Sequence, residues 1–145
     1  MPGAGSVGHS CPTPSITANV GGLSVAVFGL TVPMITERML ARKVSAYVFD
    51  DPIETAAGLV PELRAAHDVV IALTHIGLAE DRRLAEAVPG IDLIVGGHTH
   101  TVLETPETVA GVSILQAGWR GRWLGRADIE TVGNSLKVTA GMLEL

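Results

Sequence analysis

Two apolar runs in the middle of the chain flank a segment with helical periodicity. The runs, Asp68–Thr74 and Ile91–Val95, are short and rich in β-branched residues, which predicts two buried strands. Between them, Ala79–Val88 places Leu84 on an inner face and charged residues, among them Asp81, on the outer face of an amphipathic helix. Strand, helix and strand in this order predict a βαβ unit with two parallel strands and a right-handed crossover.

The pattern before this unit predicts a hairpin and then a helix. Ile16–Val20 and Leu23–Leu30 are strand-like and are separated by two glycines, which favour a tight hairpin turn. Asp51 followed by Pro52 marks a helix start, because an aspartate can cap the first turn and a proline suits it; metal ligation by this aspartate or its neighbour is the alternative. Pro61 lies inside the helical pattern and is expected to kink or split the helix.

The pattern after the βαβ unit predicts short strands joined by loops rather than by helices. Such connections favour antiparallel pairing. The first 15 residues combine prolines and glycines without apolar periodicity, so residues 1–15 are expected to form a disordered or loop terminus and residues 16–145 one domain. The strands predicted in the second half are Thr101–Leu103, Val112–Gln116, Trp123–Val132 and Leu136–Ala140.

Composition narrows the class of protein. Of the 145 residues, 47% are hydrophobic and 17% are charged, which excludes a disordered chain. Only 3% are aromatic, so the core of the α/β domain that the element pattern predicts must be aliphatic. A net charge of −5 argues against nucleic-acid binding, which needs a basic surface. The longest apolar run is too short to cross a membrane, and the first residues lack the features of a signal peptide. The sequence therefore assigns the protein to no particular cellular compartment.

Three histidines follow the two strands of the βαβ unit. His75 ends the first strand, and His98 and His100 follow the second strand after Gly96 and Gly97. Carboxyl ends of parallel strands share one edge of a sheet, and residues i and i+2 of an extended segment project to the same side, so these side chains can converge. Three neutral imidazoles can hold a zinc-like ion with one position open for water. The alternative is a set of loop histidines without a function.

Two metal ions about 3.5–4 Å apart catalyse phosphoester hydrolysis better than one ion does, because they stabilise both the attacking and the leaving oxygen. Two ions need more ligands than three histidines, including a bridging group. The chain contains no Asp-x-His, no Gly-Asp and no Gly-Asn-His sequence that could supply them. The three histidines therefore indicate one part of a two-metal site, without the groups that would bridge the two ions.

The histidine motifs and their flanking segments resemble calcineurin-like metallophosphoesterases, most closely the branch of 5′-nucleotidases and 2′,3′-cyclic-nucleotide phosphodiesterases. The segments that carry the resemblance are Val69–Gly77, Val88–His100, Gln116–Gly118 and Gly121–Gly125. The resemblance implies a four-layer α/β/β/α sandwich with a dinuclear centre of divalent ions of the Zn, Mn, Fe or Mg type. It also implies that His75 and His98 are ligands of one ion and His100 of the other, with a metal-bridging hydroxide that attacks phosphorus.

The ligand motifs of the family's first half are missing, so residues 16–145 resemble the C-terminal portion of a catalytic domain. The implied function is hydrolysis of a phosphomonoester or nucleotide. A non-catalytic domain that binds at most one ion, or acts only in association with another chain, is the alternative, and a mononuclear three-histidine hydrolase is a third hypothesis. Family members are often periplasmic or secreted.

Partners and substrate contacts are less well defined by the sequence. A sheet without its neighbouring strands exposes edges and apolar faces, so we expect self-association or pairing with a chain that carries the missing half. Arg120, Arg122 and Arg126 could clamp a phosphate, but their spacing in and before a strand favours a solvated strand face.

Overall fold

The structure is a computed structural model and describes residues 14–34, 49–133 and 135–145. The predicted terminus at residues 1–15 falls almost wholly outside the described residues. These residues form eight strands and two helices, with bounds β1 Ser15–Val20, β2 Leu23–Thr31, α1 Pro52–Ala66, β3 Val69–His75, α2 Leu78–Ala87, β4 Leu93–Val95, β5 Glu107–Val109, β6 Val112–Leu115, β7 Trp123–Val132 and β8 Ser135–Glu144.

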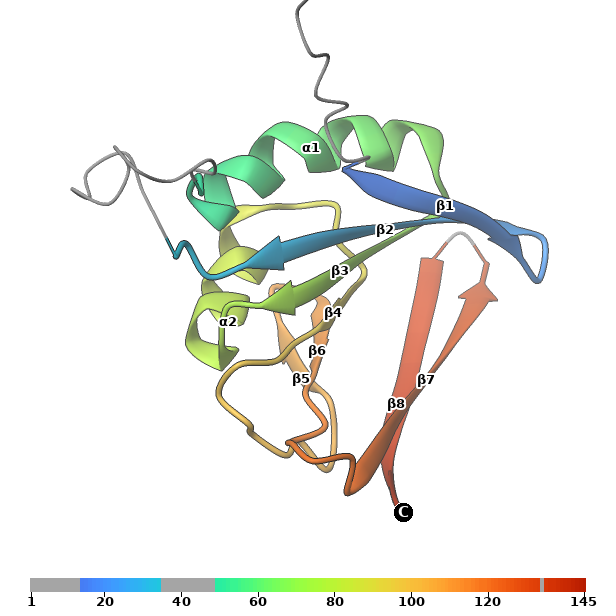
Figure 1. Ribbon diagram of the computed structural model, residues 1–145. Helices are drawn as coiled ribbons and strands as arrows, with labels where there is room; N and C mark the ends of the chain where they lie inside the picture. The colour runs from blue at the N-terminus through green and yellow to red at the C-terminus, as the bar shows by residue number, and fades with distance from the viewer. Residues whose placement is uncertain (1–13, 35–48, 134) are drawn as a thin grey trace, which may run out of the picture.

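Six strands form one mixed sheet in the order β1-β2-β3-β4-β6-β5. Strands β2, β3, β4 and β6 are parallel, and β1 and β5 are antiparallel strands at the two edges. Both helices pack on one face of this sheet, and the hairpin of β7 and β8 stands on the other side (Figure 1). The predicted βαβ unit is confirmed as β3, α2 and β4.

The parallel part of the sheet is larger than the sequence pattern predicts. Strand β6 runs parallel to β4, with Leu93 opposite Ser113 and Val95 opposite Leu115, so the antiparallel pairing expected in the second half is wrong for this pair, whereas it is found for β5 with β6 and for β7 with β8. The segment between the two strands is long enough to return the chain to the start of the sheet, as a parallel pair requires. The predicted strand Thr101–Leu103 is reduced to a single bridge between Val102 and Ala117, and β5 was not predicted.

Local turn and cap chemistry explains the elements that were predicted correctly. Gly21 and Gly22 have φ values of 60° and 86°, which suit the two-residue turn between β1 and β2. The Asp51 carboxylate accepts from the amides of Ile53 and Glu54 at 2.8 and 3.0 Å, so Asp51 caps α1.

Helix α1 is one continuous helix through Pro61, so of the two expected effects, a kink or a split, the split is wrong. Pro61 and Ala57 are both exposed, and the Ala57 carbonyl that loses its helical donor can therefore be hydrated. The opposite face of the helix packs into the core through Val60 and Leu63.

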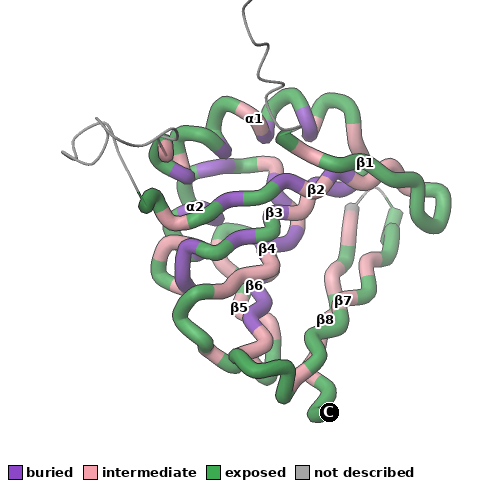
Figure 2. Tube along the Cα trace, viewed as in Figure 1, coloured by how far each residue is buried: buried purple, intermediate pink, exposed green. Residues whose placement is uncertain are grey.

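The core lies between the helices and the sheet, where buried positions concentrate (Figure 2). The other face of the sheet is only partly covered, and Leu73 of β3 is 55% exposed there. The hairpin approaches that face near the amino ends of β2 and β3 and leaves a gap of about 250 Å³, lined by Val20, Leu23, Val25, Val69, Ile71, Ala127 and Ile129. Neither described helix has the length and apolarity needed to cross a membrane.

Candidate functional site

Strand β3 carries His75 to the carboxyl edge of the sheet. His75 is its last residue and lies opposite Thr31 of β2, and its carbonyl accepts from the Val32 amide at 3.1 Å. An open pocket of about 520 Å³ lies beside it, lined by Gly29, Leu30, Thr31, Leu73, Thr74, His75, Gly96 and Gly97. Ligands of open α/β sheets bind at this edge.

His98 approaches His75 from the neighbouring strand end. The two imidazole rings are 5.1 Å apart between centroids and meet edge to face at 75°. Gly97 makes this approach possible, because a Cβ atom at that position would lie 3.0 Å from Nδ1 of His75. The structure therefore brings together one histidine from each strand of the βαβ unit.

His100 has a different neighbour. Its ring stacks on Trp119 with centroids 5.3 Å apart and planes 7° from parallel. The Arg120 guanidinium carbon lies 4.2 Å from the centroid of the same indole. Within residues 14–34, 49–133 and 135–145, no three histidine, cysteine or carboxylate side chains are grouped so that they could hold a metal ion.

The histidine pair fits part of a metal site. Imidazoles are suitable ligands for a zinc-like ion, and two of them lie together here, but a closed tetrahedral site needs four ligands and a catalytic site at least three. The described residues supply two such ligands, His75 and His98, side by side, whereas the third histidine, His100, stacks on Trp119. They do not complete a centre by themselves.

Asp81 of α2 lies beside the site. Its charge predicts a position on the solvent side of the helix, and this prediction is wrong. Asp81 is fully buried, and its Oδ1 accepts from the Thr74 hydroxyl at 2.6 Å. Oδ2 has no hydrogen-bond partner among the described residues. Burial raises the pKa of the Asp81 carboxyl, which the Thr74 hydrogen bond offsets in part. The spacing to Leu84, three residues on, is the helical signal that could have revealed its orientation.

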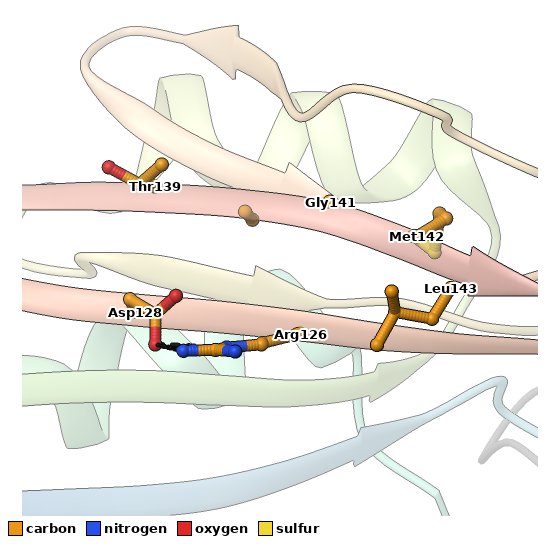
Figure 3. Close-up of a pocket in the computed structure, with 7 residues that line it drawn as sticks. Arg126, Asp128, Thr139, Gly141, Met142 and Leu143 are labelled. Atoms are coloured by element: carbon orange, nitrogen blue, oxygen red, sulfur yellow. Dashed lines mark hydrogen bonds and ion pairs between the residues drawn. The ribbon is translucent and has the colours of Figure 1, made fainter.

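The arginines considered as phosphate clamps lie near the hairpin. A hollow of about 340 Å³ on β7 and β8 includes Arg126, whose guanidinium pairs with Asp128 at 2.9 Å on the same strand (Figure 3). Arg120 lies over Trp119. The Arg126 pairing favours the alternative of a solvated strand face at that residue.

Known relatives match most of this chain. A trifunctional nucleotide phosphoesterase, YfkN, from Bacillus subtilis is 42% identical over 121 residues, which cover 80% of this chain and 8% of the relative. An uncharacterized metallophosphoesterase, YunD, from the same organism is 32% identical over 74% of this chain and 22% of its own length. Several 5′-nucleotidases also match over a minor part of their length. No family model matches the chain.

The fold also matches part of a solved structure. The Thermus thermophilus sulfate thiohydrolase SoxB superposes with a TM-score of 0.78 and 26% identity, over 90% of this chain and 24% of SoxB. The chain thus spans less than a quarter of each of these three proteins.

Proposed function

Because the chain is homologous to a portion of the 5′-nucleotidase and metallophosphoesterase family, we propose that it forms the C-terminal part of a metal-dependent phosphoester hydrolase domain. The observation that carries the proposal is the imidazole pair of His75 and His98, whose ring centroids lie 5.1 Å apart beside a pocket at the carboxyl edge of the sheet. Nucleotides or other phosphomonoesters are the substrate class, since its relatives include a nucleotide phosphoesterase and 5′-nucleotidases.

In this proposal His75 and His98 hold one divalent ion, and His100 contributes to a second. A divalent ion bound there would polarise a phosphoryl oxygen and lower the pKa of a bound water. The carboxylate and amide ligands come from the part of the catalytic domain that relatives carry outside the matched segment. The same part supplies the strands and helices that complete a four-layer sandwich over the hairpin side of the sheet.

Complementation tests this proposal. The purified chain is mixed, in the presence of Mn²⁺ or Zn²⁺, with the part of the Bacillus subtilis relative YfkN that adjoins the matched region within the same catalytic domain, without the rest of that trifunctional protein. We expect hydrolysis of an aryl phosphate and of AMP by the mixture and not by either piece alone. A mixture with His98→Ala is the control and should be inactive. A stable, metal-loaded complex of the two pieces without phosphatase activity would contradict the proposal.

The alternative is a non-catalytic domain that binds at most one ion or acts only in association with another chain. The absence of a three-ligand group among the described residues favours it for the isolated chain. Metal analysis separates the two, because the complemented domain should bind two ions and a non-catalytic domain one or none. The mononuclear three-histidine hypothesis is not favoured, since His100 stacks on Trp119.

A further inference from the structure

The turn that carries His98 and His100 has an unusual backbone. Both histidines have positive φ, 79° and 58°, a conformation that residues with a side chain rarely adopt. The Thr99 amide donates to the Gly97 carbonyl at 3.1 Å, which closes a γ-turn around His98. A γ-turn with positive φ is rare and strained, so surrounding contacts must maintain it.

Gln116 supplies such contacts from the end of β6. Its side chain is 1% exposed, and its Nε2 donates to the same Gly97 carbonyl at 2.5 Å. Its Oε1 accepts from the Thr99 hydroxyl at 2.9 Å and from the Thr101 amide at 3.0 Å. The buried Gln116 amide is therefore hydrogen-bonded to Gly97 before His98, to Thr99 between the two histidines, and to Thr101 after His100.

Both lone pairs of the Gln116 carbonyl oxygen are used, and the Thr99 hydroxyl also accepts from the Leu78 amide at 3.3 Å. The turn is thus tied to β6 and to the start of α2. A buried amide with this many partners tolerates few alternative positions, because each lost bond leaves an unsatisfied group in the interior.

We propose that Gln116 is a positioning residue that holds the Gly97–Thr101 turn in its positive-φ conformation and so directs His98 toward His75. This inference rests on the proposed function for its metal-binding consequence. Side chains that orient metal ligands through hydrogen bonds commonly change metal affinity 10- to 100-fold when they are removed.

Amide hydrogen exchange, followed by NMR in the metal-free chain, tests the structural half of this inference. Gln116→Met keeps the length of the side chain but removes its hydrogen-bonding groups, so we expect the Thr101 amide to exchange about tenfold faster. The Leu103 amide is the internal control, because it donates to the backbone carbonyl of residue 116 and should keep its rate.

Zn²⁺ titration, followed through the imidazole signals of His75 and His98, tests the functional half. We expect Gln116→Met to weaken binding about 10- to 100-fold. Ile114→Val is the matched control, since it removes a buried methyl group from the same strand without touching the turn, and its affinity should match that of the unmodified chain. Thr99→Val, at an exposed position of the turn, should weaken binding, and Thr99→Ser, which keeps the hydroxyl, should restore it.

The outcomes separate this inference from the proposed function. If the unmodified chain alone binds no Zn²⁺, the titration moves to the complemented domain, where absence of binding would count against the proposed function, and the Thr101 exchange rate decides whether Gln116 holds the turn. An unmodified chain that binds Zn²⁺ no more tightly than Gln116→Met would overturn the positioning role. If Gln116→Met does not fold, equal affinities of Thr99→Val and Thr99→Ser would overturn it instead.

Discussion

Two adjacent glycines decide how closely side chains approach one another around the site. At Gly96 an added Cβ would collide with the Asp81 carboxylate, and at Gly97 it would press on the His75 ring. Neither glycine has a positive φ, so the requirement is for space and not for conformational freedom. The Gly-Gly step thus lets a buried carboxyl and an exposed imidazole lie against the same short stretch of backbone.

Substitution of the second glycine tests this close approach. Gly97→Ala should displace the His75 ring, lower stability by about 1–2 kcal/mol through overpacking, and weaken Zn²⁺ binding about tenfold. Gly58→Ala is the control, because open space surrounds that position in α1, and it should stabilise the chain by about 0.5–1 kcal/mol. Urea unfolding and Zn²⁺ titration measure both effects. Unchanged Zn²⁺ affinity in Gly97→Ala would show that the His75 ring has room to move.

Asp81 should make stability depend on pH. Because its pKa is raised in the folded chain, the folded state retains a proton to higher pH than the unfolded state does. The contribution of the Asp81 carboxyl to the free energy of unfolding is therefore fully present below the ordinary pKa of 3.8 and is lost as the pH rises through the raised pKa. Asp81→Asn removes the charge, so the stability of this variant relative to the unmodified chain should rise between pH 4 and pH 8. Urea unfolding at both pH values, with exposed Asp128→Asn as the control, measures this; a pH-independent difference would contradict it.

At the scale of elements, an arginine fastens the end of α1 to the sheet. Arg64 pairs with both carboxylate oxygens of Asp92 at 3.0 and 2.8 Å, and its second nitrogen donates to the carbonyls of His67 and Asp68. Asp92 Oδ2 also accepts from the Val70 amide at 2.7 Å. The helix end, β3 and the approach to β4 therefore share one polar cluster that is only partly exposed.

Loss of this arginine should destabilise the fold. Arg64→Met keeps much of the aliphatic stem but leaves Asp92 without its charged partner, so we expect a loss of about 1–2 kcal/mol, reduced from the fully buried case by solvent screening. Arg83→Met breaks an exposed pair with Glu80 on α2 and should change stability by less than about 0.5 kcal/mol. Chemical denaturation compares them, and equal losses would show that the cluster adds nothing beyond a surface pair.

Elements were predictable where the determining chemistry is local. The Gly21-Gly22 turn and the Asp51 cap depend on neighbouring residues, and both lie where the sequence indicates. The parallel pairing of β6 with β4 depends on a partner distant in sequence, and no pattern within Val112–Leu115 records which strand it joins. The prediction that Asp81 faces solvent is wrong, because its helical spacing to Leu84 places this charged residue on the buried face of α2.

At the scale of the whole molecule, one face of the sheet is left partly uncovered. The helices bury one side of β2, β3 and β4, whereas the hairpin of β7 and β8 meets the other side only near the amino ends of the strands (Figure 1). Leu73 of β3 and Leu124 and Leu143 of the hairpin are each at least half exposed. An open sandwich of this kind presents apolar surface to other chains.

We therefore expect the isolated chain to self-associate as its concentration rises. Leu73→Gln should shift the sedimentation profile toward the monomer, since it places a polar group on the uncovered face. Leu145→Gln changes a leucine that is even more exposed than Leu73 but lies at the end of the described chain, and it should leave the profile unchanged. A Leu73→Gln variant that associates as strongly as the unmodified chain would exclude this face as the contact.

The histidine site was predictable in part. The βαβ topology places the ends of β3 and β4 together, and the 5.1 Å separation of the His75 and His98 rings follows from that placement. The stack of His100 on Trp119 joins segments that only the complete tertiary structure brings into contact. Gln116 could be recognised as part of a motif, but its bonds to the turn depend on the register of β4 and β6.

The hydroxyl of Thr99 has a consequence for the order in which the molecule assembles. Gly77 at the start of α2 offers no side chain to cap the helix, and the Leu78 amide finds its acceptor in Thr99, which follows β4. The first turn of α2 therefore gains this bond only after β4 and the histidine turn have docked. We expect these two segments to open together as one cooperative unit, so that slowly exchanging amides of both should share a single opening free energy.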